Sequence, residues 1–411
     1  MPAARYEVLR RREFRLVFGA ASVSLLGDGV LPVALAFAVL DLTGSATDLG
    51  IVLAARTVAL VASLLAGGVV ADRLGRRPVM IGADLTRLVT QSAIGLLLIG
   101  GHATVAEIAA SQALLGAATG FFNPASSGLL PTVSGGQLQQ ANALLGIAGA
   151  AGNIAGPAIA GALVLATGPG AALLIDAATY GISAALLAAL NLGADAHPSA
   201  APQRFRAALR DGFDEVRSRT WLSAVIIVFS LLNMVASAFP VLGALVAKHK
   251  LGGAGAWAAI LAARAVGGLL GGTALLRFSP RRPLLVAVLA CATAPVPTLL
   301  LAPPAPLALL IPAALLGGAG PMVFNALWET TLQQHIPEHA RSRVSSYDWF
   351  GSLALQPLGY ALAGPLAGAI GVAAALYVCG GIEFGLLASL LCVRDVRTLT
   401  AGSDTTTAGI L

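Results

Sequence analysis

Five ionisable side chains stand inside long apolar stretches of the sequence, where they could exchange protons or balance charge. Asp28, Asp176 and Glu383 are acids, and Arg56 and Arg264 are bases. An unpaired ion among apolar groups costs several kcal/mol, so each needs a function or a partner. We predict that Asp28 is the main proton carrier and that Glu383, more central in its stretch than Asp176, is the second candidate. Arg56 and Arg264 are predicted as counter-charges or cavity cations, and a pair of Asp28 with Arg56 is the structural alternative.

Other residues with chemical potential are predicted to be structural. Asp84 and Arg87 are three residues apart, the spacing of an ion pair on one helix face. His335 and His339 have the spacing of a helical metal site, but Pro337 lies between them, so we predict a solvated loop and no metal site. The sequence contains no nucleotide-binding P-loop, HExxH pattern or nucleophile elbow. We therefore expect no enzyme and no cofactor.

The stretches that hold these residues are predicted to be membrane-spanning helices. Of the 411 residues, 57% are hydrophobic and 11% are charged, whereas about 25% of a soluble chain is charged. Runs of about 20 apolar residues are long enough to cross a bilayer. The sequence predicts an all-α polytopic membrane protein with 12 transmembrane helices in two pseudo-symmetric six-helix bundles. The predicted spans are 14–40, 47–71, 78–101, 104–128, 140–166, 169–192, 220–247, 254–277, 282–302, 306–331, 343–368 and 371–393.

The basic residues predict how these spans are oriented. With the N-terminus inside, 20 of the 25 Lys and Arg fall on the cytoplasmic side, two fall outside and three lie within spans. This asymmetry follows the positive-inside rule, places both termini in the cytoplasm, and explains the net charge of +6 without nucleic acid. The preference for Arg over Lys indicates a GC-rich bacterial genome. We expect a multi-pass protein of the bacterial inner (cell) membrane.

The two halves of the chain resemble each other. Residues 53–56 recur as 261–264, and residues 76–78 recur as 281–283. Matching order and spacing indicate six helices followed by six helices, the architecture of many secondary transporters.

The repeat suggests domain boundaries. We predict a first bundle over 1–192, a cytoplasmic linker over 193–219, a second bundle over 220–393 and a cytoplasmic tail over 394–411. Within the linker, 203–216 has one apolar face and basic flanks, a pattern typical of an amphipathic helix on the inner leaflet.

A charged cluster follows the second predicted span, and we call it the rim cluster. Its small residues allow close helix approach, and its acid can hold nearby arginines. This predicted gating latch consists of Gly68, Asp72, Arg73, Gly75, Arg76 and Arg77, with Glu329 and Asp348 as further partners for its arginines. The order of glycine, acid, basic residue, glycine and two basic residues resembles the signature of the major facilitator superfamily. That resemblance implies a cluster that stabilises the outward-facing state and breaks when the inside opens.

The fifth predicted span carries small residues at about every fourth position. They allow close helix packing, and the proline among them kinks the helix. This pattern resembles a motif of the drug:proton antiporters in that superfamily, with a simple packing seam as the alternative. The residues are Gly152, Gly156, Pro157 and Gly161.

Five further stretches resemble the macrolide-efflux and enterobactin-exporter branch of the superfamily: 26–28, 42–45, 121–125, 141–142 and 175–177. One position departs from the antiporter pattern. Many of these antiporters have an arginine in helix 4, four residues before a glycine, whereas this chain has Gln112 before Gly116. Proton coupling through that arginine is therefore not available.

Residues and resemblance together predict proton-coupled secondary active efflux of amphipathic small molecules by alternating access. The expected partners are the substrate, protons and membrane lipid, and the chain is expected to be a monomer. An ion-coupled nutrient importer is the second hypothesis, disfavoured by an aromatic content of 5%. A lipid-handling or non-transporting membrane protein of the same fold is the third. The candidates for the substrate cavity, with hydrogen bonding between helices as their alternative role, are Asn123, Asn153, Asn233, Asn325 and Trp328.

Overall fold

The structure is a computed structural model that describes residues 7–191 and 214–400. All regular elements in these residues are helices. The first half of the chain forms η1 (Glu7–Arg10), α1 (Arg12–Thr43), α2 (Ala46–Leu74), α3 (Arg76–Ile99), α4 (Val105–Ser134), α5 (Leu138–Thr167) and α6 (Pro169–Ala188). The second half forms α8 (Thr220–Ala236), α9 (Ala238–Lys250), α10 (Ala254–Ala274), η2 (Leu275–Arg277), α11 (Pro283–Cys291), α12 (Val296–Leu301), α13 (Leu307–His335), α14 (Glu338–Ala354), α15 (Gln356–Ile370), α16 (Val372–Leu390) and α17 (Arg394–Thr398). The predicted amphipathic segment 203–216 lies almost wholly outside the described residues.

Eleven helical stretches in the described part of the chain are long and apolar enough to cross a membrane. Each corresponds to one predicted span. Three consist largely of two helices in succession, namely α8 with α9, α11 with α12, and α14 with α15. The remaining predicted span, 78–101, is α3, a helix of 24 residues that is less apolar because it carries charged residues such as Asp84 and Arg87. The predicted all-α architecture is confirmed.

Local sequence explains several helix ends. At the start of α4, Thr104 and Glu107 form a reciprocal capping box, in which each side chain accepts a hydrogen bond from the other's backbone N–H. Gly44 ends α1 in the left-handed conformation, with φ of 66°. The break between α11 and α12 contains Pro295, which has no N–H to continue the helix. There Thr293 Oγ1 donates to the carbonyl of Leu316 in α13 at 2.7 Å.

The packing divides the chain into two compact units. The first unit comprises Met1–Ala200, Ser237–Ala262 and Pro357–Val372. The second unit comprises Ala201–Ala236, Ala263–Gln356 and Ala373–Leu411. The first unit thus contains α1 to α6 together with α9, the beginning of α10 and most of α15.

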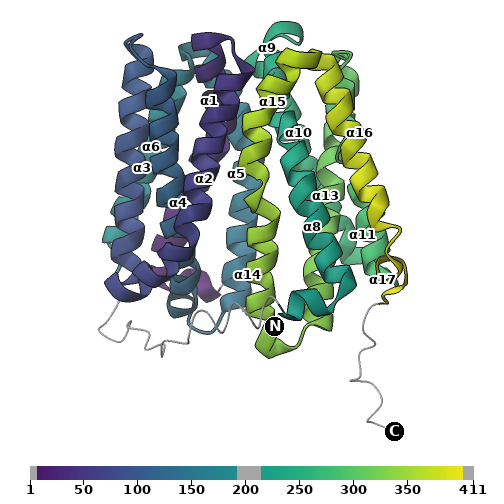
Figure 1. Cartoon of the computed structure of the whole chain (residues 1–411). Helices are drawn as coiled ribbons and strands as arrows, with labels where there is room; N and C mark the ends of the chain where they lie inside the picture. Colours follow the sequence, from purple (N-terminus) through teal and green to yellow (C-terminus); the bar gives the residue numbers. More distant parts are fainter. Residues whose placement is uncertain (1–6, 192–213, 401–411) are drawn as a thin grey trace. The chain divides into compact units, whose positions relative to one another are not determined.

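In the first unit, α2 packs against α4, α3 packs between α4 and α6, and α1 packs against α5 and α6 (Figure 1). A side chain on Gly116 of α4 would collide with the backbone carbonyl of Arg56 in α2. In the second unit, Gly318 of α13 lies in the same way against the carbonyl of Arg264 in α10. The internal repeat therefore recurs in three dimensions, since corresponding glycines approach corresponding arginines.

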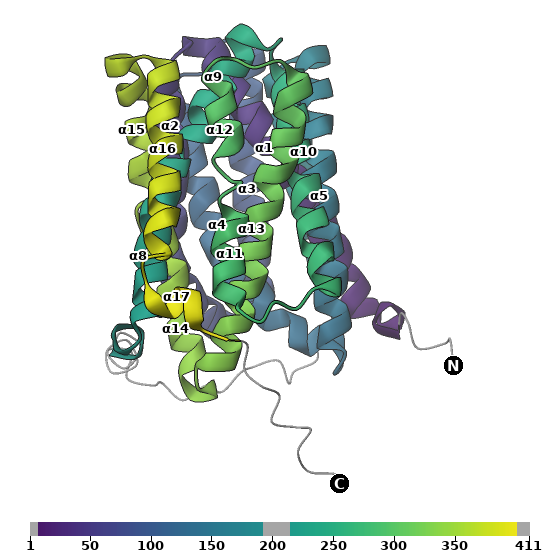
Figure 2. The same cartoon turned by 90° about the vertical axis from the view of Figure 1, so that its right-hand side faces the viewer.

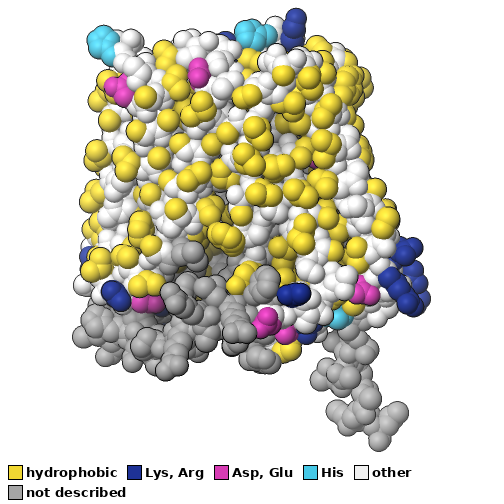
Figure 3. Space-filling model, viewed as in Figure 1, with side chains coloured by type: hydrophobic (Ala, Val, Ile, Leu, Met, Phe, Trp, Pro, Cys, Tyr) yellow, Lys and Arg dark blue, Asp and Glu magenta, His cyan; other side chains and the backbone are white. Residues whose placement is uncertain are grey.

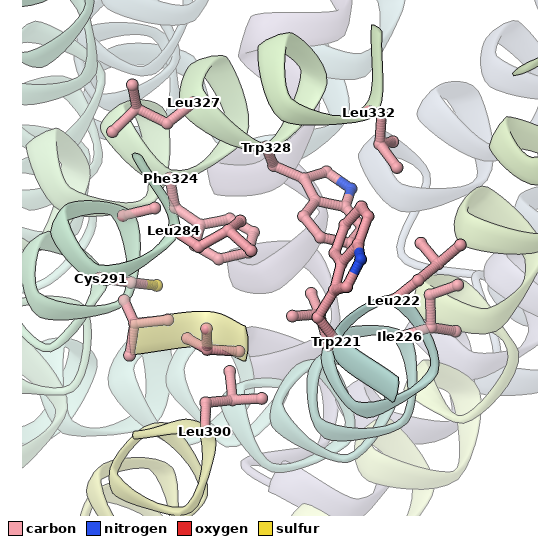
Figure 4. Packing of buried hydrophobic residues seen from close by; sticks show 14 of the residues in the cluster. Trp221, Leu222, Ile226, Leu284, Cys291, Phe324, Leu327, Trp328, Leu332 and Leu390 are labelled. Carbon is pink, nitrogen blue, oxygen red and sulfur yellow. The ribbon is translucent and has the colours of Figure 1, made fainter. Parts of the chain in front are cut away.

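In the second unit, α13 packs against α11 and α12, and α8 packs against α14 (Figure 2). Its core is a cluster of buried side chains around Trp221, Phe324 and Trp328 (Figure 4). The rings of Trp221 and Trp328 meet edge to face at 5.6 Å, and Phe324 stacks on Phe229 at 3.9 Å. Such aromatic pairs add about 0.5–1.5 kcal/mol beyond the area they bury.

The surface is apolar along the helices, and charged side chains gather at the helix ends (Figure 3). Large exposed hydrophobic side chains, such as Val89, Leu96 and Ile227, lie on the outer faces of these helices. A soluble monomer rarely exposes apolar patches of this extent. The protein is therefore a multi-pass membrane protein.

Candidate functional site

Asp28 lies on α1, is partly buried, and accepts a hydrogen bond of 2.8 Å from the hydroxyl of Tyr180 on α6. Tyr180 itself is fully buried. Among the ion pairs of the described residues, none joins Asp28 to Arg56. The structure therefore does not contain the alternative ion pair of Asp28 with Arg56, because the direct partner of Asp28 is the phenol of Tyr180.

Tyr180 belongs to a row of polar side chains on one face of α6, formed with Asp176 and Ser183. The spacings of four and three residues put all three on the side that faces α1 and α3. Asp176 Oδ2 accepts a hydrogen bond of 2.8 Å from Gln91 on α3, and Ser183 donates to Asp84 at 2.6 Å. The row therefore joins α6 to both neighbouring helices inside the first unit.

The row continues into a larger buried network. Gln112 on α4 donates to the side-chain oxygen of Gln91 at 3.1 Å, so a chain of amides leads from α4 through α3 to Asp176. We call this set the buried polar network, and its members are Asp28, Asp84, Arg87, Gln91, Gln112, Asp176, Tyr180 and Ser183.

Arg87 is the buried cation of this network. Its guanidinium forms an ion pair with Asp84 at 3.3 Å, which confirms the predicted pair. The same guanidinium lies over the rings of Phe122 and Tyr180, at 4.6 and 5.3 Å from their centroids. Both the carboxylate and the aromatic faces stabilise the buried charge.

The second unit holds a separate buried acid, Glu383 on α16, which is 2% exposed. Its Oε1 atom has no hydrogen-bond partner among the described residues. Arg264 on α10 interacts with it electrostatically. Glu383 is thus buried near an arginine, and its role as the second proton carrier stays a prediction.

The acid of the rim cluster pairs with one of its arginines. Asp72 lies 3.8 Å from Arg76, and its side chain is 53% exposed. Arg76 also donates to the carbonyl of Gly128, and Arg77 donates to the carbonyls of Leu187 and Ala188 at 3.0 and 2.5 Å. The arginines therefore hold backbone carbonyls of α4 and α6, while Arg73 is exposed.

The glycines of the rim cluster also differ in role. Gly75 connects α2 to α3 with φ of 90°, a conformation that favours glycine. Gly68 has open space at its Cβ position, whereas its neighbour Gly67 lies against the carbonyl of Gly120 on α4. The close-approach glycine of the motif is therefore Gly67 and not Gly68.

Two acids of the second unit were predicted as further partners of the rim arginines. Asp348 accepts a hydrogen bond of 2.9 Å from the indole of Trp328. Glu329 lines a hollow of about 390 Å³ together with Arg341 and Ser345. Their link to the rim cluster stays a prediction.

The small residues of α5 lie at close helix contacts. A Cβ on Gly152 would come within 2.5 Å of the carbonyl oxygen of Leu25, and one on Gly156 would collide with the backbone of Gly29. A Cβ on Gly161 would come within 2.6 Å of Ala258 on α10. Pro157 is buried beside Gly156. We call this the glycine seam.

The candidates for the substrate cavity separate into two groups. Asn123, Asn153 and Asn325 are exposed on their helices. Asn233 donates to the carbonyl of Ser352 at 3.0 Å, which fits its alternative role as a link between helices. Trp328 is 4% exposed and packed in the core of the second unit, and its place in a substrate cavity stays a prediction.

His335 was predicted to lie in a solvated loop. It is instead the last residue of α13, and its ring meets Trp221 edge to face at 6.3 Å. Among the described residues, no group of His, Cys, Asp and Glu is arranged to hold a metal ion.

A family model described as "Major Facilitator Superfamily" matches residues 17–354 of the chain. The chain belongs to the major facilitator superfamily. This agrees with the resemblance of the rim cluster and of the glycine seam to superfamily motifs.

Among the relatives of this superfamily member is the multidrug efflux pump Tap of Mycolicibacterium fortuitum, which is 30% identical over 88% of this chain and 91% of its own length. The multidrug efflux pump Tap of Mycobacterium tuberculosis is also 30% identical, over 87% of both chains. A solved peptide transporter POT shares the fold with a TM-score of 0.78 at 13% identity, covering 95% of this chain and 96% of that chain. The nucleoside transporter NupG has a TM-score of 0.74 at 14% identity, covering 92% and 99%.

Tyr180 and Gln91 of this superfamily member, which join the network of Asp28, were not singled out from the sequence, and Gln112 was noted only for not being an arginine. Asp176 was named only as one of the acids inside apolar stretches. The available signal was the presence of glutamines and an acid inside apolar spans, which buried hydrogen bonding must satisfy. Fold and family together make the protein a membrane transporter.

Proposed function

We propose that this protein exports amphipathic small molecules and drives their efflux with protons, by alternating access. Its place would be a bacterial inner membrane, with both termini in the cytoplasm. Export of drugs is supported by the relatives, which are multidrug efflux pumps over nearly their whole length. The observation that carries proton coupling is the position of Asp28, a partly exposed carboxyl that joins a buried polar network.

Asp28 suits proton exchange because it has two kinds of surroundings. The residue is only partly buried, while one of its oxygens accepts a hydrogen bond from a buried phenol. A carboxyl in this position can take up a proton from water and then be enclosed by a small movement of α1 against α6. Arg87, the buried cation of the network, already has Asp84 as its partner and does not fix the charge of Asp28.

The exposed amides support a polar path for the substrate. Asn123, Asn153 and Asn325 are exposed on otherwise apolar helices. An amide that faces lipid without a hydrogen bond costs free energy, so such side chains are expected to face a water-filled space. Amides there can bind the polar groups of an amphipathic molecule while apolar neighbours bind the rest.

Alternating access is supported by contacts at one end of the first unit. Lys248 on α9 pairs with Asp41 at the end of α1 at 2.7 Å and donates to the carbonyl of Leu40 at 2.5 Å. Nearby, Gly50 of α2 lies against the backbone of Tyr360 on α15. An ion pair and a small-residue contact can separate without exposing a large apolar core.

The energy of one proton is adequate for resistance to a drug. At a membrane potential of about 150 mV, one entering proton supplies about 3.5 kcal/mol. This maintains roughly a 300-fold gradient of a neutral substrate.

The test uses the full chain reconstituted in liposomes with an imposed pH gradient, with ethidium as a fluorescent amphipathic probe. Ethidium should accumulate against its gradient while protons flow the opposite way. Asp28→Asn should retain ethidium binding and downhill exchange but lose pH-driven accumulation. The matched variant Tyr180→Phe keeps the acid and loses only its hydrogen-bond donor, so accumulation should persist with a changed pH dependence.

Each contrary result has a defined meaning. Accumulation by Asp28→Asn at the wild-type level would place the carrier elsewhere, and Glu383→Gln would be measured next. Movement of ethidium in the same direction as protons would replace export by import. No transport of any probe in a substrate panel would favour a lipid-handling or non-transporting protein.

A further inference from the structure

We propose that Asp176 is a second proton-binding site, a carboxyl that the fold holds as the neutral acid in the packed first unit. Its place in a transport cycle rests on the proposed function. Its protonation rests only on the contacts around it.

The two oxygens of Asp176 have unequal surroundings. Oδ2 accepts one hydrogen bond, from Gln91 at 2.8 Å. Oδ1 is buried and has no hydrogen-bond partner among the described residues. It faces the backbone of α1, where a Cβ added to Gly27 would lie 2.5 Å from it. An ionised carboxylate needs hydrogen-bond donors or a cation at both oxygens, whereas a neutral carboxyl needs fewer such partners.

The charges around Asp176 also favour the neutral acid. The groups that act on it electrostatically are Asp28 from α1, Arg56 from α2 and Arg87 from α3. Arg87 is engaged by Asp84 at 3.3 Å, and no ion pair joins Arg56 to Asp176 in the described part of the chain. Asp28 is a like charge. An ionised Asp176, enclosed and without a dedicated cation, is therefore unfavourable next to a second carboxylate.

The glutamines fix the orientation of this site. The amide of Gln91 donates to Asp176 and accepts from Gln112 on α4, so its NH₂ group points toward the acid. Amides donate a hydrogen bond without adding positive charge. Gln91 and Gln112 are therefore positioning residues that hold the carboxyl in place without supplying a counter-charge.

The site is linked to Asp28 through α6 and α1. Tyr180, which binds Asp28, lies one helical turn after Asp176, and Gly27, which covers Asp176, precedes Asp28 in α1. A shift of α1 along α6 would therefore change the surroundings of both acids at once. Asp176 would meet water and release its proton only when Gly27 moves away from Oδ1.

The test is infrared difference spectroscopy on the full chain in lipid nanodiscs, at about pH 8, where ordinary exposed carboxyls are ionised. The wild type should show a C=O stretching band of a protonated carboxyl that shifts in D₂O. Asp176→Asn should remove this band. Gln91→Leu should keep it and move its frequency, because the hydrogen bond to Oδ2 is lost. Glu383→Gln, which removes a buried acid of the second unit, is the control and should leave the band of Asp176 in place.

The outcomes separate this inference from the proposed function. If Asp176→Asn folds, as judged by its thermal midpoint, and its spectrum matches the wild type, Asp176 is ionised and the inference is wrong. The same holds if Gln91→Leu leaves the frequency unchanged. If the band is lost in Asp176→Asn while the wild type fails to accumulate ethidium in a pH gradient, the site stands and proton-coupled export does not.

Discussion

The glycine seam gives a prediction whose size can be worked from the structure. Gly156→Ala adds one methyl group where α5 meets α1. That methyl would collide with the backbone of Gly29, and in the reverse direction a Cβ on Gly29 would lie 3.0 Å from the Cα of Gly156. Because both partners are backbone, no side-chain rotation relieves the contact.

The expected cost follows from the separation required. Carbon atoms pack at about 3.5–4 Å, so α1 and α5 must move apart by roughly 1–1.5 Å to relieve the contact of this methyl with Gly29. Overpacking of this kind costs about 1–3 kcal/mol. That cost corresponds to a roughly 5- to 150-fold fall in the ratio of folded to unfolded protein.

The assay compares thermal unfolding of Gly156→Ala and Gly149→Ala in the same detergent. Gly149 lies on the same helix and has open space at its Cβ position. Alanine there should be neutral or stabilising by up to about 1 kcal/mol, because it is the better helix former. Equal stability of the two variants would refute the close approach of α5 to α1. A stable Gly156→Ala that no longer transports ethidium would indicate that the seam moves during transport.

Three further predictions follow from the helix ends and the cavity candidates. Asp72→Asn removes an exposed ion pair with Arg76, worth about 0.2–1 kcal/mol. The fold should survive while labelling of a cysteine on the side of the rim cluster increases. Unchanged labelling with full transport would indicate that the rim cluster is a topology signal only. Lys248→Asp should repel Asp41 and increase labelling from the opposite side, and the exchanged pair of Asp41→Lys with Lys248→Asp should restore protection. Equal labelling of the single and exchanged variants would exclude a gate. Asn325→Ala should change the substrate spectrum while the abundance of the protein stays normal. Trp328→Ala should destabilise the core by about 3–5 kcal/mol and reduce abundance. The reverse pattern would contradict an exposed Asn325 and a core Trp328.

Much of the fold follows from the sequence because membrane insertion depends on local properties. A stretch of about 20 apolar residues is long enough to cross a bilayer wherever it stands in the chain. The predicted spans therefore correspond to the observed helices, although the break near Pro295 within the predicted span 282–302 was not predicted. The pair of Asp84 and Arg87 was also predictable, since residues three apart meet on a single helix.

The partners of the site residues were decided by tertiary structure. Successive residues of a helix point about 100° apart. A small error in the predicted rotation of a helix therefore changes which of its residues faces a neighbouring helix. Gly67 rather than Gly68 contacts α4 for this reason, and Asp28 meets Tyr180 of α6 rather than Arg56 of α2. Hydropathy shows that a helix crosses the membrane, but it contains no information about which face meets which neighbour. The sequence thus determined the spans, the repeat and the candidate acids, and only the packing of α1, α3, α4 and α6 joined those acids into one network.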